Sequence, residues 1–492
     1  MQEFIKPKYA GRRWEIAFGS YEGVHQFAVN ELQRMVQRYL PYVVVVRAAS
    51  APPHREDSNL ILVGTPDKNR RLAELIARGA LDAPEGPQGY SIAIADSPDG
   101  GGRRMAAIAG SDPAGVLYGV EDFNARVLAL GIAEDKPELQ QQAFDAMANV
   151  AFREAPAINN RGIWTWGYTI YDYRRFLDNM ARLRMNMLTI WNHCVPANCR
   201  EVIEYAHLRG VQVVLGFHWG WGQEGFDLAK PDDRRRIKEI VLDNYRRNYR
   251  DLSADGIYFQ TLTEHAITEK DGMTTAAAAC RLVNEISREL YAERADLYIQ
   301  FGLHATSIQD RYADLAELDE RVVIAWEDAG VIPFSYDAVL EFPPSPGRPT
   351  TPQGTIEYAR KLATFRKGTE FAMVPKGWTH LRWSDEFEYH GPFVLGERDG
   401  QFIRRRLERR ARRWDQSNAF WTLNYPHAVR FYRELLACRP PKMTVTGLIE
   451  DGVFEQVIQP SAALFAQMIW DPSRDEQELL RLASSPYYAI WQ

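Results

Sequence analysis

The chain has 492 residues, a length that predicts two or three domains because it exceeds what one ordinary core accommodates. Its 46% hydrophobic and 25% charged residues are typical of a soluble globular protein. The net charge of −6 argues against nucleic-acid binding, which normally shows a basic surplus. No apolar run approaches the length that spans a membrane, so we expect no membrane partner.

Four cysteines, Cys194, Cys199, Cys280 and Cys438, show no paired framework and predict free thiols in a reducing compartment. Residues 1–6 carry no apolar leader core. We therefore expect a cytoplasmic protein, with secretion left open if a leader has been removed.

Residues 1–150 predict a small α/β domain in which strands alternate with helices. The pair Asp112-Pro113 fits a helix start, since Asp caps free backbone N–H groups and Pro is tolerated in the first turn. The glycines between 110 and 119 lack the spacing of a dinucleotide-binding loop, and we expect no cofactor. Strands are expected near 14–18, 43–46, 60–64, 90–94 and 105–110, and helices near 23–39 and 70–78.

Residues 151–428 contain eight apolar runs that alternate with amphipathic stretches, the pattern of parallel βαβ units. Eight such units predict a (β/α)₈ TIM barrel, followed by a helical C-terminal region over 429–492. The arginine-rich stretch 404–413 has helical spacing and is interpreted as a solvated helix face. Strands are expected at 160–166, 187–192, 211–218, 256–262, 297–303, 321–327, 370–375 and 418–423, and helices near 171–184, 197–209, 231–250, 274–293, 307–317, 354–367 and 398–415.

Nearly every apolar run ends in aromatic, imidazole or carboxylate side chains, and a TIM barrel places its active site at these C-terminal strand ends. Sugar-binding clefts use such groups, because a pyranose stacks on aromatic rings while its hydroxyls need polar partners. Aromatic rings also fill cores, so both interpretations stay open for each ring. The candidate substrate-binding residues are Trp164, Trp166, Asn192, His193, His218, Trp219, His265, His304, Trp326, Trp378 and Tyr425.

Carboxyl groups at two strand ends are the candidate catalytic residues. Glu264 follows strand four, where aromatic surroundings would raise its pKa and suit it as the general acid for a glycosidic oxygen. Glu327 and Asp328 close strand six, and one of them supplies the base or nucleophile. Neighbouring residues of a strand point to opposite faces, so at most one of the two is expected to face the pocket. Helix capping or ion pairing is the alternative for Glu264.

Cations and histidines at the strand ends suggest two further interpretations. Lys376, Arg382 and Arg161 would suit a substrate carboxylate, with ordinary ion pairing as the alternative. The four histidines with Glu264 would suit a divalent metal, but strand one has no His-x-His and strand four no bridging Lys. We therefore expect no metal.

The chain resembles the α-glucuronidase family of glycoside hydrolases and its hexosaminidase-like relatives. The resemblance rests on diffuse matches over most of the chain, at 110–123, 161–166, 171–193, 263–264, 383–397 and 470–472. It implies an N-terminal α/β domain, a catalytic barrel and a helical C-terminal region, with Glu264 at the place of the family's general acid. Strand seven departs from the α-glucuronidases, because it ends in Lys376 and carries no acid. Thr263 before Glu264 departs from the carboxylate pair of hexosaminidases.

These observations predict an exo-acting glycoside hydrolase that cleaves a terminal acidic sugar with two carboxyl groups. A sialidase or hexosaminidase-type glycosidase of the same architecture is the first alternative. A metal-dependent barrel hydrolase and a carbohydrate-binding protein without catalysis are the others. The expected partner is a carbohydrate, with no nucleic acid and no membrane, and a homodimer is left open.

Overall fold

The computed structural model describes residues 12–132, 137–192, 194–219, 225–260, 267–327, 349, 351–376, 393–449 and 453–489. It divides into two units, the first formed by Met1–Ala155 with Ser485–Tyr487 and the second by Pro156–Ser484 with Tyr488–Gln492. Within the described parts of the chain, no helix is both long and apolar enough to cross a lipid bilayer.

The first unit is built on a mixed sheet whose described strands number six, in the order β2-β1-β3-β5-β4-β6. The strands β1, β2, β3 and β5 run parallel, whereas β4 is antiparallel to both neighbours. Every residue of β3 is buried, as expected of a central strand covered on both faces. The strands are β1 (Trp14–Phe18), β2 (Val45–Ala48), β3 (Asn59–Gly64), β4 (Tyr90–Asp96), β5 (Arg104–Gly110) and β6 (Val150–Glu154).

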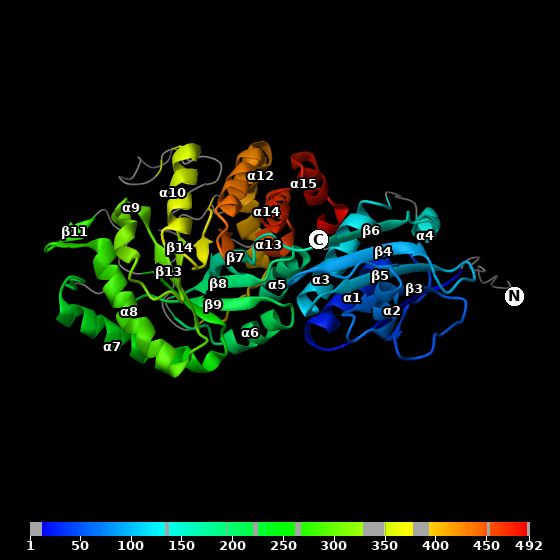
Figure 1. The fold of residues 1–492 in the computed structure, drawn as a ribbon, viewed down its shortest axis with the longest axis horizontal. Coiled ribbons are helices and arrows are strands. Elements are labelled where there is room, and N and C mark those ends of the chain that lie inside the picture. The colour runs from blue at the N-terminus through cyan, green and yellow to red at the C-terminus, as the bar shows by residue number, and fades with distance from the viewer. Residues whose placement is uncertain are drawn as a thin grey trace. The chain divides into compact units, whose positions relative to one another are not determined.

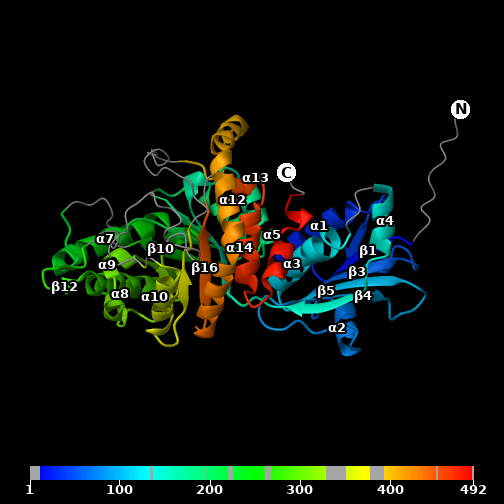
Figure 2. The same ribbon diagram turned by 90° about the horizontal axis from the view of Figure 1, so that it is seen from above.

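Helices cover both faces of this sheet, and Figure 2 shows α1 and α2 on opposite sides of it. Leu72 of α2 packs with Leu60 of β3, whereas α3 contacts α1, β4 and β5. The predicted start of α3 is confirmed, because the Asp112 carboxylate accepts from the Gly115 backbone N–H and Pro113 occupies the first turn. The helices are α1 (Gly23–Gln37), α2 (Arg70–Ala77), α3 (Pro113–Asp122), the π-helix η1 (Phe123–Ala129) and α4 (Pro137–Asp145).

The second unit contains a closed barrel of parallel strands, which confirms the predicted fold class. Among the described residues eight strands form it, each paired with its neighbour in chain order, and the last pairs with the first. Figure 1 shows these strands surrounded by helices. The strands are β7 (Asn160–Trp166), β8 (Met187–Trp191), β9 (Gln212–Gly216), β10 (Gly256–Gln260), β13 (Tyr298–Leu303), β14 (Val322–Trp326), β15 (Phe371–Met373) and β16 (Met443–Leu448).

The helices of the second unit follow the strands as the sequence predicted for strands one to seven. Most present an apolar side to the barrel; Phe176 of α5 and Ile237 of α7, for example, are buried. The hairpin β11 (Glu269–Lys270) and β12 (Met273–Thr274) is an addition between β10 and α8. The helices are α5 (Tyr173–Arg182), α6 (Cys199–His207), α7 (Pro231–Asn248), α8 (Thr275–Glu293), α9 (Ala305–Ile308), α10 (Pro352–Thr364), α12 (Gly400–Ala437), α13 (Val453–Gln456), α14 (Pro460–Trp470) and α15 (Glu476–Ala483).

The predicted eighth strand is wrong. Residues 418–423 lie inside α12, and the eighth strand is β16, which starts beyond the expected barrel boundary at residue 428. A short apolar run has the same appearance in a buried helix and in a strand, and Trp421 in fact packs against Phe465 of α14. The true strand was overlooked because it carries Thr444 and Thr446, whose polar side chains are buried.

A buried carboxyl group lies in α13, which follows β16. Glu455 is 2% exposed, and its Oε1 accepts a hydrogen bond of 2.7 Å from the Tyr171 backbone N–H. Its Oε2 has no hydrogen-bond partner among the described residues. Burial raises the pKa of this carboxyl from 4.5 to about 8, because a charge is costly away from water. The folded protein therefore binds this proton more tightly than the unfolded chain.

Replacing Glu455 by Gln keeps an acceptor oxygen and removes the titration. Because the pKa of Glu455 is raised in the folded state, its bound proton contributes fully to the free energy of unfolding below about pH 4.5. This contribution is lost as the pH rises toward 8. At about pH 7.5, Glu455→Gln should therefore unfold at a higher temperature than the wild type. Its free energy of unfolding should be larger by up to roughly 3 kcal/mol. The difference should vanish near pH 4.5, as measured by thermal unfolding across this range. The exposed Glu239→Gln is the control, and a gain independent of pH would contradict the argument.

Candidate active site

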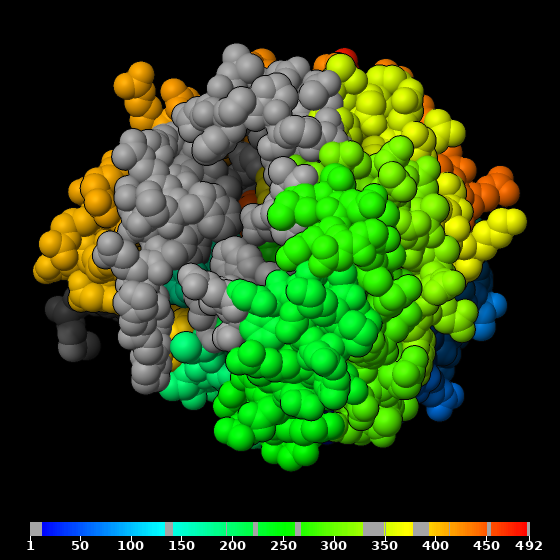
Figure 3. Space-filling view, turned by 90° about the vertical axis from the view of Figure 1, so that its left-hand side faces the viewer, coloured from blue at the N-terminus to red at the C-terminus, as the bar shows by residue number. Residues whose placement is uncertain are grey.

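The candidate site lies where the barrel strands end, because parallel strands bring their C-terminal ends to one mouth. Figure 3 shows the side of the molecule that carries α7 and α8. Several of the predicted site residues lie outside the described residues: Glu264, Asp328, His193, His265, Trp378 and Arg382. The others can be placed.

Glu327 is the centre of a buried hydrogen-bond network at this mouth. Its Oε2 accepts a hydrogen bond of 2.5 Å from the Tyr258 hydroxyl, and its Oε1 accepts one of 3.2 Å from Gln260 Nε2. His304 Nε2 lies 3.8 Å from Glu327 Oε2 and 3.4 Å from Gln260 Nε2. These four residues are at most 5% exposed. Glu327 thus faces the barrel interior. The sequence alone could not tell whether its side chain points into the barrel or out of it.

Gly302 of β13 makes this network sterically possible. The strand β13 lies between β10, which carries Tyr258 and Gln260, and β14, which precedes Glu327. A Cβ atom on Gly302 would lie 2.6 Å from Glu327 Oε2 and 2.3 Å from the Tyr258 hydroxyl oxygen. Any larger residue would therefore occupy the space through which the carboxylate reaches across β13 to β10.

Three predicted tryptophan and histidine positions share the interior with Glu327. The Trp164 ring meets the Tyr258 ring edge-on at 5.8 Å, and Trp166 meets Trp164 at 5.5 Å between ring centroids. His304 contacts the network directly. Trp191 at the end of β8 packs against Trp166 at 4.4 Å between ring centroids. These rings form an aromatic wall on the β7 and β8 side of the interior.

Two other predicted tryptophans belong to the layer between strands and helices. Trp219 stacks on Phe259 at 3.3 Å between centroids, and Phe259 alternates with Tyr258 and therefore faces outward. Trp326 packs against Tyr358 of α10 at 5.0 Å. Both are fully buried, so the structure assigns them to core packing rather than to the pocket.

Of the remaining predicted positions, Asn192, His218 and Lys376 follow barrel strands, whereas Tyr425 does not. Asn192 is buried beside Gly167, and His218 is half-buried, with burial lowering the pKa of its imidazole. Lys376 is half-buried after β15. Tyr425 lies in α12 and ends no strand, which corrects its placement on the rim.

Arg161 lies at the opposite end of the barrel from Glu327. It is near the start of β7 and donates to the carbonyl oxygens of Ile158 and Arg184, at 2.6 and 3.0 Å. Its guanidinium also lies over the Trp470 ring. Arg161 therefore stabilises the N-terminal end of the barrel, and the suggestion that it binds a substrate carboxylate is wrong. No group of three His, Cys, Asp or Glu side chains suited to a metal occurs in the described part of the chain.

Solved glycoside hydrolases share this architecture. CpGH84B matches with a TM-score of 0.52 at 11% identity, over 95% of this chain and 70% of its own. A mutant β-hexosaminidase from Streptomyces plicatus, in complex with the product GlcNAc, matches with a TM-score of 0.51 at 11% identity, over 96% of this chain and 90% of that one.

The fold is that of hexosaminidase-like glycoside hydrolases. The resemblance drawn from the sequence is therefore confirmed for the fold. No protein-family model and no curated protein matches the sequence, so the likeness rests on the three-dimensional structure.

Sequence reasoning missed Tyr258, Gln260 and Gly302. The signal that could have found them is alternation along β10, where Tyr258 and Gln260 occupy the face opposite to Ile257 and Phe259. Polar residues on one face of an otherwise apolar barrel strand need partners, because an unpaired buried polar group is costly. Only the structure shows that Glu327 is that partner.

Gly302→Ala tests the network at its narrowest point. The added methyl group should displace Glu327 or Tyr258 and lower the free energy of unfolding by about 1–3 kcal/mol in urea denaturation. Gly400→Ala is the matched control, because nothing lies within 4 Å of its added Cβ, and it should change stability by less than about 1 kcal/mol. If the two substitutions changed the free energy of unfolding equally, the space above Gly302 would not be needed for the Glu327 network.

Proposed function

We propose that the chain is an exo-acting glycoside hydrolase that cleaves a terminal sugar with two carboxyl groups. The observation that carries this proposal is the Glu327 carboxylate, held by two hydrogen bonds inside the mouth of a TIM barrel. The fold shared with glycoside hydrolases supports it as an analogy, because TIM barrels host many other chemistries.

Glu327 is proposed as the base or nucleophile. The Tyr258 hydroxyl and the Gln260 amide each donate to a different carboxylate oxygen, so the plane of the carboxylate is fixed before substrate binds. The Trp164 and Trp166 rings close by offer apolar faces on which a sugar ring can stack.

Glu264 is proposed as the general acid that protonates the leaving oxygen. In the sequence it follows Gln260 by four residues, and Gln260 is the last residue of β10 and a direct partner of Glu327. Glu264 therefore follows in sequence a strand whose last residue belongs to the Glu327 network. Their separation decides the stereochemistry, since roughly 5–5.5 Å gives retention and roughly 6.5–9.5 Å inversion.

Two classes of terminal sugar follow from different observations. An acidic sugar is the first proposal, because Lys376 follows the end of β15 by three residues and would offer a cation near the mouth. An N-acetylhexosamine is the second, because the β-hexosaminidase of similar fold holds GlcNAc as product. Aryl uronides, sialosides and N-acetylhexosaminides, supplied as one panel, distinguish the two by which is turned over.

Glu327→Gln and Glu264→Gln should each lower kcat about 10²–10⁴-fold on the best substrate of this panel. The two losses should differ in kind. A substrate with a strongly activated leaving group needs no protonation, so it should restore much of the activity of Glu264→Gln and little of that of Glu327→Gln. Steady-state kinetics with nitrophenyl and methylumbelliferyl glycosides measure both effects.

Glu239→Gln on α7 is the control for a lost exposed carboxylate and should keep the wild-type kcat. Unchanged turnover in Glu327→Gln with an intact fold would refute its role. Sugar binding by the wild type without turnover of any panel member would instead favour the carbohydrate-binding alternative. Loss of activity on chelation, with metal found by elemental analysis, would favour the metal-dependent one.

A further inference from the structure

A second pocket lies among the elements that leave the barrel at the mouth. It has a volume of about 460 Å³ and is bordered by the starts of α5 and α12 and by the end of α13. These helices follow β7, β15 and β16 in the chain, so the pocket lies at the C-terminal ends of the barrel strands. The Glu327 site lies at the same end. The lining residues are Asp172, Arg175, Arg398, Gly400, Ile403, Arg404, Leu407, Glu408 and Gln456.

The lining is more basic than the protein as a whole. Its lining residues include three arginines and two acidic residues, although the chain carries a net charge of −6. Asp172 caps α5 by accepting from the Arg175 backbone N–H at 3.1 Å, and its carboxylate also forms an ion pair with Arg175 Nε at 3.7 Å, so these two charges partly offset each other. Arg398 Nε is buried and has no hydrogen-bond partner among the described residues.

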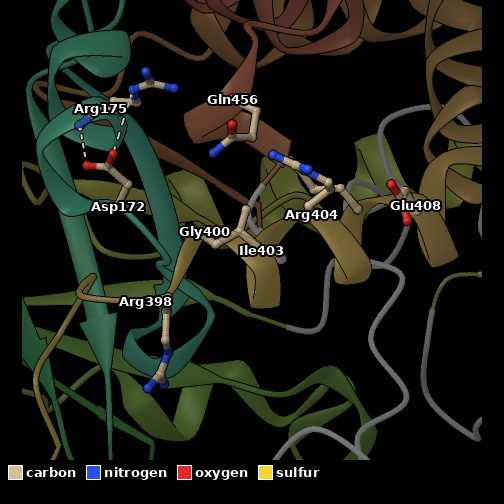
Figure 4. A pocket seen from close by; sticks show the side chains of 9 residues that line it. Asp172, Arg175, Arg398, Gly400, Ile403, Arg404, Glu408 and Gln456 are labelled. Atoms are coloured by element: carbon tan, nitrogen blue, oxygen red, sulfur yellow. Dashed lines mark hydrogen bonds and ion pairs between the residues drawn. The ribbon is translucent and has the colours of Figure 1, made fainter.

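Figure 4 shows how the polar groups lie. Arg404 extends from α12 toward Gln456, and Arg175 stands beyond Gln456 on the other side of the pocket. Arg398 points away from these groups. Arg404 is exposed, so its charge is available to a ligand that enters from solvent. Two guanidinium groups and one amide thus border a space large enough for a small acidic molecule.

A short segment joins this pocket to the aromatic wall of the candidate active site. Trp166 ends β7 inside the barrel, Tyr168 stacks on it at 6.2 Å, and Asp172 lines the second pocket. Trp166 and Asp172 are six positions apart, so their Cα atoms lie at most about 22 Å from each other even in a fully extended chain. A ligand of a few sugar units is therefore long enough to reach from one place to the other.

We propose that this pocket is an accessory subsite for an anionic oligosaccharide, whose acidic groups pair with Arg404 and Arg175 while its terminal sugar occupies the Glu327 site. The inference rests on the proposed function and specifies its substrate class as an acidic glycan. Planar guanidinium groups suit carboxylates because they donate two parallel hydrogen bonds. Gln456 supplies an amide for a sugar hydroxyl.

Binding of a hexameric oligogalacturonate, followed by isothermal titration calorimetry, tests the proposal on the full chain. Arg404→Gln should weaken binding about fivefold, and Gln456→Glu should weaken it at least as much by adding a negative charge. Arg412→Gln is the matched control, because Arg412 is an exposed arginine of the same helix outside the pocket lining. It should stay within about twofold of the wild type. Added salt should weaken wild-type binding.

A neutral hexamer of N-acetylglucosamine and inorganic phosphate complete the design. Equal effects of Arg404→Gln and Arg412→Gln on the oligogalacturonate would overturn the proposal, as would tighter binding of the neutral hexamer. Binding of phosphate but not of the oligogalacturonate would also overturn it. The titration needs no turnover and can be repeated in Glu327→Gln. Failure of this subsite would therefore appear as lost arginine dependence, whereas failure of the proposed function would appear as absent hydrolysis of aryl glycosides.

Discussion

The pairing of β16 with β7 is the interaction on which the second unit depends. It joins residues about 280 positions apart, with Thr444 opposite Asn160 and Leu448 opposite Trp164. Side chains reinforce it, since Asn160 Nδ2 donates to the Thr444 hydroxyl at 2.9 Å. Closure leaves no strand edge unpaired and fixes the tilt of every strand. Without it, the ends of all eight described strands would not meet at one mouth.

Alternation along the closed strands then decides which residues can act. Side chains at the mouth divide into inward ones, such as Glu327 and Tyr258, and outward ones, such as Trp219 and Trp326. The outward tryptophans pack under helices, where they contribute apolar burial. Side chains at the strand ends thus serve either the pocket or the core, according to the direction in which they point. The proposed chemistry uses only the inward ones.

Polar groups at the two ends of the barrel serve different purposes. At the N-terminal end, Arg161 donates to backbone carbonyl oxygens, and Glu370 accepts a hydrogen bond of 2.6 Å from the Tyr298 hydroxyl. These contacts give both residues a structural role. At the mouth, the carboxylate of Glu327 is oriented by donors and lies beside aromatic rings. The proposed accessory subsite adds cations on the same side, at Arg404 and Arg175, so an acidic glycan would contact the barrel at one end only.

The sequence by itself determined the α/β class, the first seven barrel strands and the helix start at Asp112, because periodicity and capping are local properties. It also placed a carboxylate at the end of strand six. It could not identify β16, whose buried threonines hide its apolar character, nor separate the wall of Trp164 from the core packing of Trp326. Those distinctions depend on which side chains meet across the closed barrel. The tertiary structure alone decided that Glu327 reaches over Gly302 to Tyr258, since that contact joins three strands whose register no local pattern encodes.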